Sequence, residues 1–349
     1  MFDLENWKNL VKIDSTKDSP IQIGHSIVVD GHVEGKKNSV FTHFHADHIS
    51  DFDLVTSKSY EKILLHRITK DVMVALKKPR KFMRNIKQLE YGEEHPTKFG
   101  ETITLFDADH ILGSSQVLVD VDNTKILYSG DFVFPSASIP KCDVLILDAT
   151  HGVPQFTNNI DKDSELASLL FETRKKVVEE QKPVLVSANK GTLQEIIKFL
   201  DGGSDEYFLD DEIPFMIKKN DQMILSALYP ELNSARNFID FDSVEAYRMR
   251  MRKSPCIIFS SKFEEPELEN VYTVLEGRYS NFKNEANISE HGRFLRLDLQ
   301  THSSYPRILD YVRRVEPTIV ITDNSRSGYA QPLAKSITDE FGKAAISRP

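Results

Sequence analysis

The sequence predicts an α/β protein in which a sheet-rich domain is interrupted by a second α/β unit. In the first half, short runs rich in Val, Ile, Leu and Thr are separated by turn residues. From about residue 161, strands instead alternate with helical patterns, which is typical of a parallel sheet. The pattern of the first half returns near residue 296. We therefore expect one domain built from 1–160 and 296–349, with an inserted domain at 161–295.

The strands expected in the first part are short and bounded by turns. They cover IQIGHSIVVDG, SVFTHFH, ETITLFDADH, SQVLVDVDNTKILYSGDF and CDVLILDAT. The Asp-Asn-Thr sequence inside the fourth run predicts a hairpin, and an Asp-Gly turn ends the first. A helix-favouring stretch at 58–88 separates the second run from the third, and it holds ten Lys or Arg against two acids.

The inserted part is expected to alternate helices and strands. A helix capped by Asp163 or Ser164 is followed by a strand, VLVSAN, and by a helix whose apolar residues recur at helical spacing. A second strand, CIIFSS, precedes a helix expected over PELENVYTVLEG. The tail then begins with a strand over 294–299, followed by a helix, the buried strand PTIVIT and a last helix.

Composition limits the class of protein. The net charge is −9, the two cysteines are not in a Cys-x-x-Cys pair, and no apolar run approaches a membrane span of about 18 residues. These features predict a cytoplasmic protein without a membrane partner. Arg248, Arg250 and Arg252 follow one another at a spacing of two, which on a strand would place them on one face. They are candidates for nucleic-acid contact, although basic runs are equally typical of solvated helix faces.

The strongest chemical signal is SVFTHFHADHI. A strand ending at Thr42 would pass into a loop where alternate residues point the same way. His43 and His45 can then meet one metal ion, while Asp47 and His48 address a second about 3.5–4 Å away. Neutral imidazoles suit zinc, and the carboxylate adds a hard oxygen ligand. The alternative is that these are unrelated surface or core histidines.

This pattern resembles the His-x-His-x-Asp-His signature of the metallo-β-lactamase superfamily. FDADHILGSSQV supplies His110 and ILYSGDF supplies Asp131, at the places of the superfamily's next two ligands. Asp109 stands before His110, where the superfamily usually has Gly. The resemblance implies an αββα sandwich and two metal sites that share Asp131. It assigns His43, His45 and His110 to the first site, and Asp47 and His48 to the second.

Three further segments resemble the β-CASP nucleases within that superfamily. In CDVLILDATHG, Asp148 fills the acidic position, and His151 stands where an aromatic residue is usual. VLVSANKGTLQEIIKFL resembles a stretch of the inserted domain that carries a basic residue, here Lys190, and Gln-Glu. LQTHSSYPRILDYVRRVEPTIVIT supplies the strand-end His302. The order and spacing match across nearly the whole chain.

One position departs from that family. The strand PTIVIT ends in Asp323, where the RNA-cutting members have a further metal-binding His and the Artemis-type DNA members have Val. Asp323 is therefore a candidate ligand of the second metal. A helix-capping or turn role for Asp323 fits the following Asn-Ser equally well.

The resemblance implies a nuclease that uses two divalent ions, zinc or, at the second site, manganese. A water activated by both metals would attack the phosphodiester bond of single-stranded RNA or DNA. His302, positioned by Asp148, would protonate the leaving oxygen, and Asp47 counts with them among the catalytic residues. Lys190, Arg248, Arg250 and Arg252 could contact the backbone of the strand. RNA processing and DNA repair are the roles that follow, by exonuclease or endonuclease action.

Two other functions remain open. A small-molecule hydrolase of the glyoxalase or lactonase kind could use the same metal domain, but it would not need the inserted domain or the Asp148–His302 pair. A non-catalytic subunit of an RNA-processing complex would usually have lost metal ligands. The sequence leaves RNA against DNA undecided, and it is compatible with a homodimer.

Overall fold

The computed structural model describes residues 7–14, 18–77, 83–157, 162–201, 213–232, 238–261, 272–276, 294–297, 299–326 and 328–348. The chain divides into two compact units. Unit 1 comprises 1–158 and 301–349, and unit 2 comprises 159–300. The expected boundaries, 160/161 and 295/296, lie within a few residues of these limits, and residue 161 itself is outside the described residues.

The first sheet of unit 1 has six strands in the order β1-β2-β3-β4-β5-β6. β1 and β2 are antiparallel to their neighbours, whereas β3 to β6 run parallel. The strands of this sheet are β1 (Val11–Ile13), β2 (Ile21–Ile23), β3 (Ile27–Val29), β4 (Asn38–Phe41), β5 (Lys62–His66) and β6 (Ile86–Leu89). The stretch at 58–88 therefore contains two strands as well as the expected helix.

The second sheet has seven strands in the order β19-β18-β11-β10-β9-β8-β7. The expected hairpin is present as the antiparallel pair β9 and β10, which is joined at Asp122 and Asn123. β10, β11, β18 and β19 are parallel, so their carboxyl ends meet at one edge. The strands of this sheet are β7 (Glu94–Pro96), β8 (Thr102–Asp107), β9 (Ser115–Val121), β10 (Thr124–Tyr128), β11 (Val144–Asp148), β18 (Ile319–Asp323) and β19 (Ala344–Arg348).

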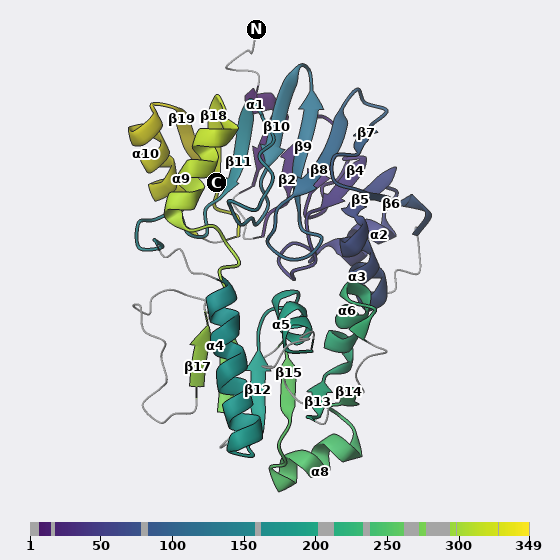
Figure 1. Cartoon of the computed structure of the whole chain (residues 1–349). Helices are drawn as coiled ribbons and strands as arrows, with labels where there is room; N and C mark the ends of the chain where they lie inside the picture. Colours follow the sequence, from purple (N-terminus) through teal and green to yellow (C-terminus); the bar gives the residue numbers. More distant parts are fainter. Residues whose placement is uncertain are drawn as a thin grey trace. The chain divides into compact units, whose positions relative to one another are not determined.

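The two sheets of unit 1 pack face to face around one apolar core. Ile21, Val40 and Leu64 of the first sheet join Val117 and Ile146 of the second in that core. The opposite face of the second sheet is covered by α9 (Tyr305–Val315) and α10 (Ala330–Phe341), which Figure 1 shows beside β18 and β19. The first sheet carries α2 (Phe52–Ser57) and α3 (Arg67–Lys77), with short helical turns α1 (Trp7–Leu10) and η1 (Met83–Asn85) at its margins. Unit 1 is thus an αββα sandwich.

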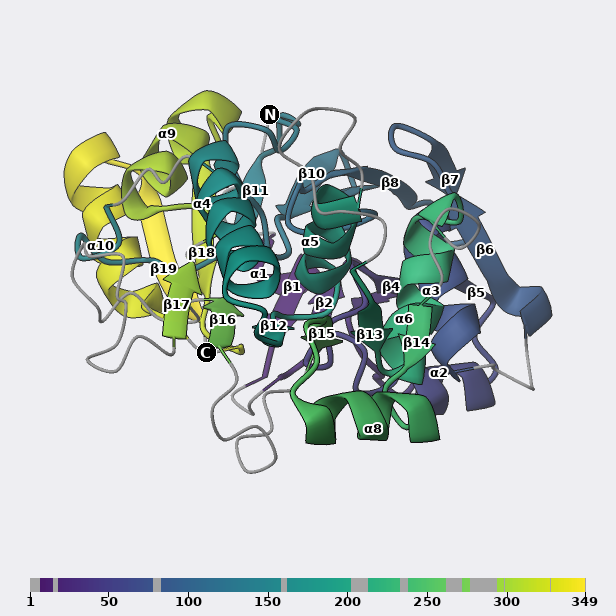
Figure 2. The same ribbon diagram turned by 60° about the horizontal axis from the view of Figure 1, so that its bottom comes forward.

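Unit 2 is built on a six-stranded parallel sheet with the order β14-β13-β15-β12-β16-β17. Its elements are visible in Figure 2. The strands are β12 (Val184–Ser187), β13 (Phe215–Ile217), β14 (Phe238–Asp240), β15 (Ile257–Ser260), β16 (Tyr272–Glu276) and β17 (Phe294–Leu297). The helices are α4 (Lys162–Arg174), continued by the π-helical turn η2 (Lys175–Glu179), α5 (Thr192–Asp201), α6 (Lys219–Leu228) and α8 (Val244–Arg252).

Two expectations about this region are wrong. The helix expected over PELENVYTVLEG lies outside the described residues except for Tyr272–Glu276, which form strand β16 between β12 and β17. Its Tyr-Thr-Val sequence has the aromatic and β-branched residues that favour strands. The strand expected at 294–299 begins the returning tail in the sequence, but β17 pairs with β16 and so completes the sheet of unit 2.

In the described part of the chain, no helix combines the length and the apolar character that crossing a membrane requires.

Candidate metal centre

The histidine motif lies directly after β4, where the chain leaves the first sheet. β4 is fully buried and parallel to both of its neighbours, so Thr42 and the residues after it emerge at the carboxyl edge. The side chains of His43 and His48 are completely buried, whereas His45 is half-buried. The backbone fixes this loop, because the amides of His48 and Ile49 both donate to the carbonyl of His45.

His110 approaches from the loop after β8. Asp109, which precedes it, has a φ of 51°, in the left-handed region. This conformation explains why the superfamily favours Gly there, and Asp is among the side chains that tolerate it. The Asp109 amide donates to Asp107 Oδ1 at 2.9 Å, which stabilises the turn. On its far side the His110 imidazole hydrogen-bonds through Nδ1 to the carbonyl of Thr301, leaving Nε2 directed toward the other histidines.

Asp131 follows β10 at the carboxyl edge of the second sheet. Gly130 before it has a φ of 53°, and a Cβ there would lie 3.1 Å from the carbonyl oxygen of Ser115. A glycine is therefore needed for the sharp turn that brings the Asp131 carboxylate back toward the histidines. The Asp131 side chain is 13% exposed.

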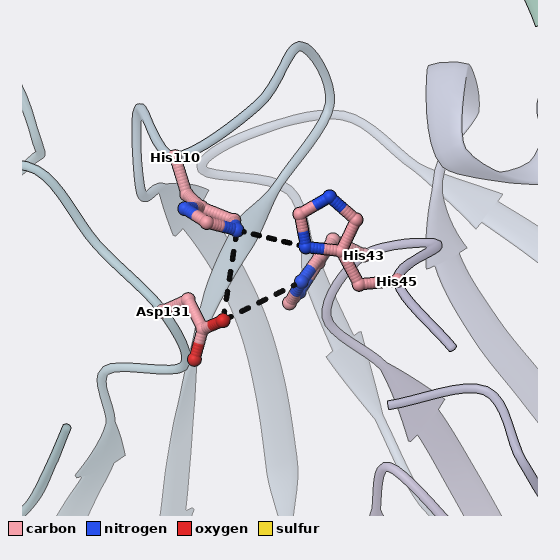
Figure 3. Close-up of side chains that lie close together, drawn as sticks. All are labelled: His43, His45, His110 and Asp131. Atoms are coloured by element: carbon pink, nitrogen blue, oxygen red, sulfur yellow. Dashed lines mark hydrogen bonds and ion pairs between the residues drawn. The ribbon is translucent and has the colours of Figure 1, made fainter. Parts of the chain in front are cut away.

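Three imidazoles and one carboxylate converge at this point (Figure 3). His110 Nε2 lies 3.1 Å from His45 Nδ1 and 3.5 Å from Asp131 Oδ2, and His43 Nε2 lies 3.7 Å from the same oxygen. The ligand atoms of the four residues all lie within 4.8 Å of one another. The structure thus brings together the three histidines of the expected first site and the shared aspartate.

The chemistry of this cluster fits a bound divalent metal. The Nε2 atoms of His43 and His48 are buried and have no hydrogen-bond partner among the described residues, which is costly unless another ligand satisfies them. Burial and the neighbouring histidines hold the pKa of His43 well below its usual range, and burial lowers the pKa of His110 to about 4. Both imidazoles are therefore neutral at pH 7, the form that binds metal.

His48 and Asp47 lie beside this cluster, and the rings of His43 and His48 are 4.1 Å apart. His48 Nε2 is 3.4 Å from Asp131 Oδ2 and 3.9 Å from Asp47 Oδ2, and the Asp47 side chain is 47% exposed. Burial alone would lower the pKa of His48, but the negative charges of Asp131 and Asp30 raise it to about 10. A second cation at this position would have to displace that proton. The assignment of Asp47 and His48 to a second metal remains a prediction.

Asp148 and His302 form a pair beside the cluster. Asp148 ends β11, and its Oδ1 accepts hydrogen bonds from the amide and hydroxyl of Thr150 at 2.8 and 2.6 Å. His302 Nδ1 donates to Asp148 Oδ2 at 3.0 Å, and His302 Nε2 lies 3.9 Å from Asp131 Oδ2. Burial lowers the pKa of His302, but the charges of Asp131 and Asp148 outweigh it and raise the pKa to about 9. His302 is thus protonated at neutral pH in this arrangement.

Asp323 is close to Asp148 in the sheet, but its carboxylate is engaged elsewhere. The two residues are register partners at the ends of β18 and β11. Asp323 Oδ1 accepts a hydrogen bond from the Ser325 amide at 2.8 Å, and Oδ2 lies 3.6 Å from Arg326 Nη1. Among the described residues, two groups of side chains could hold a metal ion, His43, His45, His110 and Asp131, and Asp131, Asp148 and His302. Asp323 belongs to neither group.

Two residues beside the centre were missed by the sequence reasoning. Asp30 is completely buried, and its Oδ2 accepts a hydrogen bond from His48 Nδ1 at 2.7 Å. Arg326, whose side chain is 7% exposed, lies behind it. Asp30 belongs to an Asp-Gly sequence that was interpreted as a turn, and its φ of 54° agrees with that interpretation. Its position directly after a buried strand was the signal that could have revealed it.

The expected substrate-binding residues all belong to unit 2. Lys190 is half-buried in the loop between β12 and α5. Gln194 closes this loop, because its Oε1 accepts from the Gly191 amide at 2.7 Å and its Nε2 donates to the Asp221 carbonyl at 3.1 Å.

The idea that the three arginines share one face of a strand is wrong, because they lie on helix α8. Its first turn is capped by Ser243, whose hydroxyl accepts from the Ala246 amide at 3.1 Å. Residues two apart point in nearly opposite directions on a helix. Arg248 and Arg252 are exposed one turn apart, whereas Arg250 turns back to donate to the Phe241 carbonyl at 2.6 Å and to stack on its ring.

Comparison with known proteins adds independent evidence. Residues 40–177 match the family model of the metallo-beta-lactamase superfamily. The "Uncharacterized protein in lig 3'region" of Acidianus ambivalens is 36% identical over 118 residues, which are 32% of this chain and 82% of that protein. An RNase J-like protein of Methanocaldococcus jannaschii is 38% identical over 80 residues, 21% of this chain and 19% of that one. Cleavage and polyadenylation specificity factor subunit 3 of Dictyostelium discoideum is 30% identical over 119 residues, 32% of this chain and 14% of that one.

The matched segments thus span less than a fifth of the length of the last two relatives. Among solved structures, a protein of unknown function from Enterococcus faecalis V583 aligns with 97% of both chains at a TM-score of 0.64, with 10% sequence identity. That likeness concerns the fold alone. The chain belongs to the metallo-β-lactamase superfamily, and its named relatives are consistent with the β-CASP group within it.

Proposed function

We propose that this chain is a metal-dependent phosphodiesterase that hydrolyses single-stranded nucleic acid. One observation carries the proposal. Asp131 Oδ2 lies between four imidazole Nε2 atoms, those of His43, His48, His110 and His302, at 3.4 to 3.9 Å. A single carboxylate therefore connects a group of metal ligands to a protonated histidine that is itself held by Asp148.

Each part of this arrangement has a role in phosphodiester hydrolysis. Divalent ions, when bound, lower the pKa of water and neutralise phosphate charge. His43, His45, His110 and Asp131 would hold one ion, and His48, Asp47 and the shared Asp131 would hold another. His302 carries a proton at Nε2 that it can donate to the leaving oxygen, and Asp148 fixes the ring through Nδ1.

The relatives support nucleic acid as the substrate class. The names of two of them, RNase J-like protein and cleavage and polyadenylation specificity factor subunit 3, refer to RNA processing. Cleavage of matched single-stranded RNA and DNA would decide between these two substrates.

An aromatic row beside the centre supports single strands over duplexes. His151 stacks on Phe156 with ring centroids 4.4 Å apart, Phe156 lies 5.5 Å from Tyr329, and His151 lies 5.6 Å from His302. Tyr329 is 41% exposed, so the row runs from the catalytic histidine to the surface of unit 1. Aromatic rings of this kind stack with unpaired bases.

The Tyr329→Ala variant is expected to raise KM for single-stranded substrates by roughly tenfold, since stacking on an aromatic ring contributes about 1–3 kcal/mol per base. Its kcat should change little, because Tyr329 does not contact the Asp131 cluster. Steady-state kinetics with the wild type and Tyr329→Phe, which keeps the ring, would measure this. Phe99→Ala, which removes a similarly exposed ring at the β7–β8 turn, is the matched control. An unchanged KM in Tyr329→Ala would exclude the aromatic row from substrate binding.

Chelation of divalent ions is expected to abolish cleavage, and adding them back should restore it. The assay compares matched 5′-phosphorylated single-stranded RNA and DNA, each with Zn²⁺ or Mn²⁺, after dialysis against a chelator. Restored cleavage would support the proposal. Faster cleavage of RNA or of DNA would show whether the chain resembles the RNA-cutting or the DNA-cutting nucleases in its substrate. Metal uptake without cleavage of either strand would favour a small-molecule hydrolase, and preference for blunt duplex would contradict the single-strand assignment.

A further inference from the structure

His48, a proposed ligand of the second metal, is backed by buried polar side chains that have no role in the proposed chemistry. Behind His48 lies a set of buried polar side chains around Arg326. Of these, Thr42 also contacts the first metal cluster, because its hydroxyl lies 3.0 Å from His43 Nδ1. Asp30, Thr42, Tyr128 and Asp323 are the other members. We call this set the Arg326 network.

Asp30 is the member that contacts a ligand. Its Oδ1 accepts from the Thr42 amide at 2.7 Å, and its Oδ2 accepts from the Thr42 hydroxyl at 2.8 Å and from His48 Nδ1 at 2.7 Å. These bonds orient the His48 ring so that Nε2 faces Asp131. Because Asp30 is completely buried, its carboxylate is costly unless a cation lies nearby.

In addition to the His48 imidazole, Arg326 places a permanent cation beside Asp30. Its Nη2 lies 3.9 Å from Asp30 Oδ2 and 3.5 Å from the Asp30 carbonyl oxygen, so the guanidinium contacts both the side chain and the backbone of Asp30. Nη1 donates to the Tyr128 hydroxyl at 3.2 Å and to the Ser325 hydroxyl at 3.1 Å. The planar guanidinium is thus fixed by groups on β10 and on the turn after β18.

Asp323 completes the network on the other side of Arg326. Its Oδ2 lies 3.6 Å from Arg326 Nη1, and its Oδ1 is bound by the Ser325 amide. One buried guanidinium therefore lies between two buried carboxylates, Asp30 and Asp323. In this arrangement Asp323 is the counter-ion of Arg326.

We propose that Arg326 is a positioning residue for the second metal: it holds Asp30, which holds His48, while Asp323 holds Arg326. This inference rests on the metal-binding part of the proposed function and is independent of the substrate. Without the guanidinium, the Asp30 carboxylate would lose its fixed place, and the His48 ring would be free to turn away from Asp131. Outer-shell partners of this kind typically change metal affinity by about 10–100-fold.

The test is a calorimetric titration of the metal-free protein with Zn²⁺ and with Mn²⁺. Arg326→Met is expected to weaken binding of the second equivalent by about 10–100-fold and to leave the first equivalent near its wild-type affinity. Arg326→Lys, which keeps the charge without the planar fork, should recover part of the loss. Arg313→Met, which removes an exposed arginine of α9, is the matched control.

Asp323→Asn separates the two roles of Asp323. If Asp323 is the counter-ion, asparagine keeps the hydrogen bond from the Ser325 amide through its one carbonyl oxygen but loses the negative charge beside Arg326. The second equivalent should then weaken no more than in Arg326→Met, and the first should bind near its wild-type affinity. Loss of the second equivalent in Asp323→Asn, with Arg326→Met unaffected, would overturn the proposal and make Asp323 a ligand. Wild-type affinity for both ions in Arg326→Met would overturn it as well.

Thermal unfolding of every variant serves as the control for correct folding. If Arg326→Met does not fold, Arg326→Lys and Tyr128→Phe, which removes one hydrogen bond to Arg326, take its place. Unchanged affinity for the second equivalent in both would then contradict the proposal. A wild type that binds no metal would instead refute the proposed function, so the two failures are distinguishable.

Discussion

Cleavage by the His302→Ala variant should fall by about 10²–10⁴-fold, the usual contribution of a positioned general acid. His302 Nε2 lies next to Asp131, and its Nδ1 is held by Asp148, so alanine removes the proton donor but leaves all four side chains of the first metal cluster in place. Single-turnover cleavage and metal content should be measured on the same preparation. Cleavage at the wild-type rate would exclude His302 from the chemistry. His25→Ala, which removes an exposed histidine paired with Asp122, is the control.

The pH profile provides a second readout for the same residue. The pKa of His302, about 9, is raised above its ordinary value, so the donor form is present at neutral pH and is lost as the pH rises through that value. A bound cation would neutralise part of the charge of Asp131 and lower this pKa. We therefore expect cleavage to decline at or below about pH 9, and this decline should be missing from the residual activity of His302→Ala.

Asp131→Asn should cause the largest loss. The same Oδ2 atom faces His43, His48 and His110, so removing its charge weakens both metal positions together. Loss of metal-assisted charge stabilisation, which is worth several kcal/mol, corresponds to a rate decrease of roughly a thousandfold or more. Metal analysis after dialysis and cleavage under saturating Mn²⁺ would measure the two effects separately.

Asp122→Asn is the matched control for this change, because Asp122 is an exposed aspartate in the turn of the β9–β10 hairpin. It should retain metal and activity. Wild-type metal content in Asp131→Asn would contradict the shared-ligand arrangement.

The histidines and aspartates at strand ends were predictable because their signals are local. His43 and His45 follow one buried strand within a few residues, and Asp131 and Asp148 each mark the end of another. His110, Asp131 and Asp148 follow strands of the second sheet, and the resemblance to the superfamily motif joined them to His43 and His45, which follow a strand of the first sheet. The sequence could therefore indicate candidate metal ligands, and the structure brings four of them, His43, His45, His110 and Asp131, together.

The Arg326 network was not predictable in the same way. Asp30 and Arg326 are almost three hundred positions apart, and each has an ordinary local explanation, a turn for Asp30 and a loop for Arg326. Their contact exists because β3 and β18 belong to different sheets of one sandwich. Sequence periodicity carries no information about which residues face each other across such a core.

The errors in unit 2 have a different cause. A spacing of two is compatible with one face of a strand, so Arg248, Arg250 and Arg252 favoured that interpretation, but the Ser243 cap sets a helix. Tyr272–Glu276 is too short for its periodicity to separate strand from helix, and its neighbours on both sides in the sheet decide the outcome.

The points where the chain leaves and re-enters unit 1 are joined to each other. The Tyr305 amide donates to the Phe156 carbonyl at 2.8 Å, so the residues on either side of unit 2 are neighbours in unit 1. The entropy lost on closing a flexible loop grows with its length, but a folded insertion with adjacent ends avoids most of that cost. Unit 1 can therefore tolerate a long excursion between its two segments, and this junction is a natural graft point at which insertions can be exchanged while β11 and α9 stay in place.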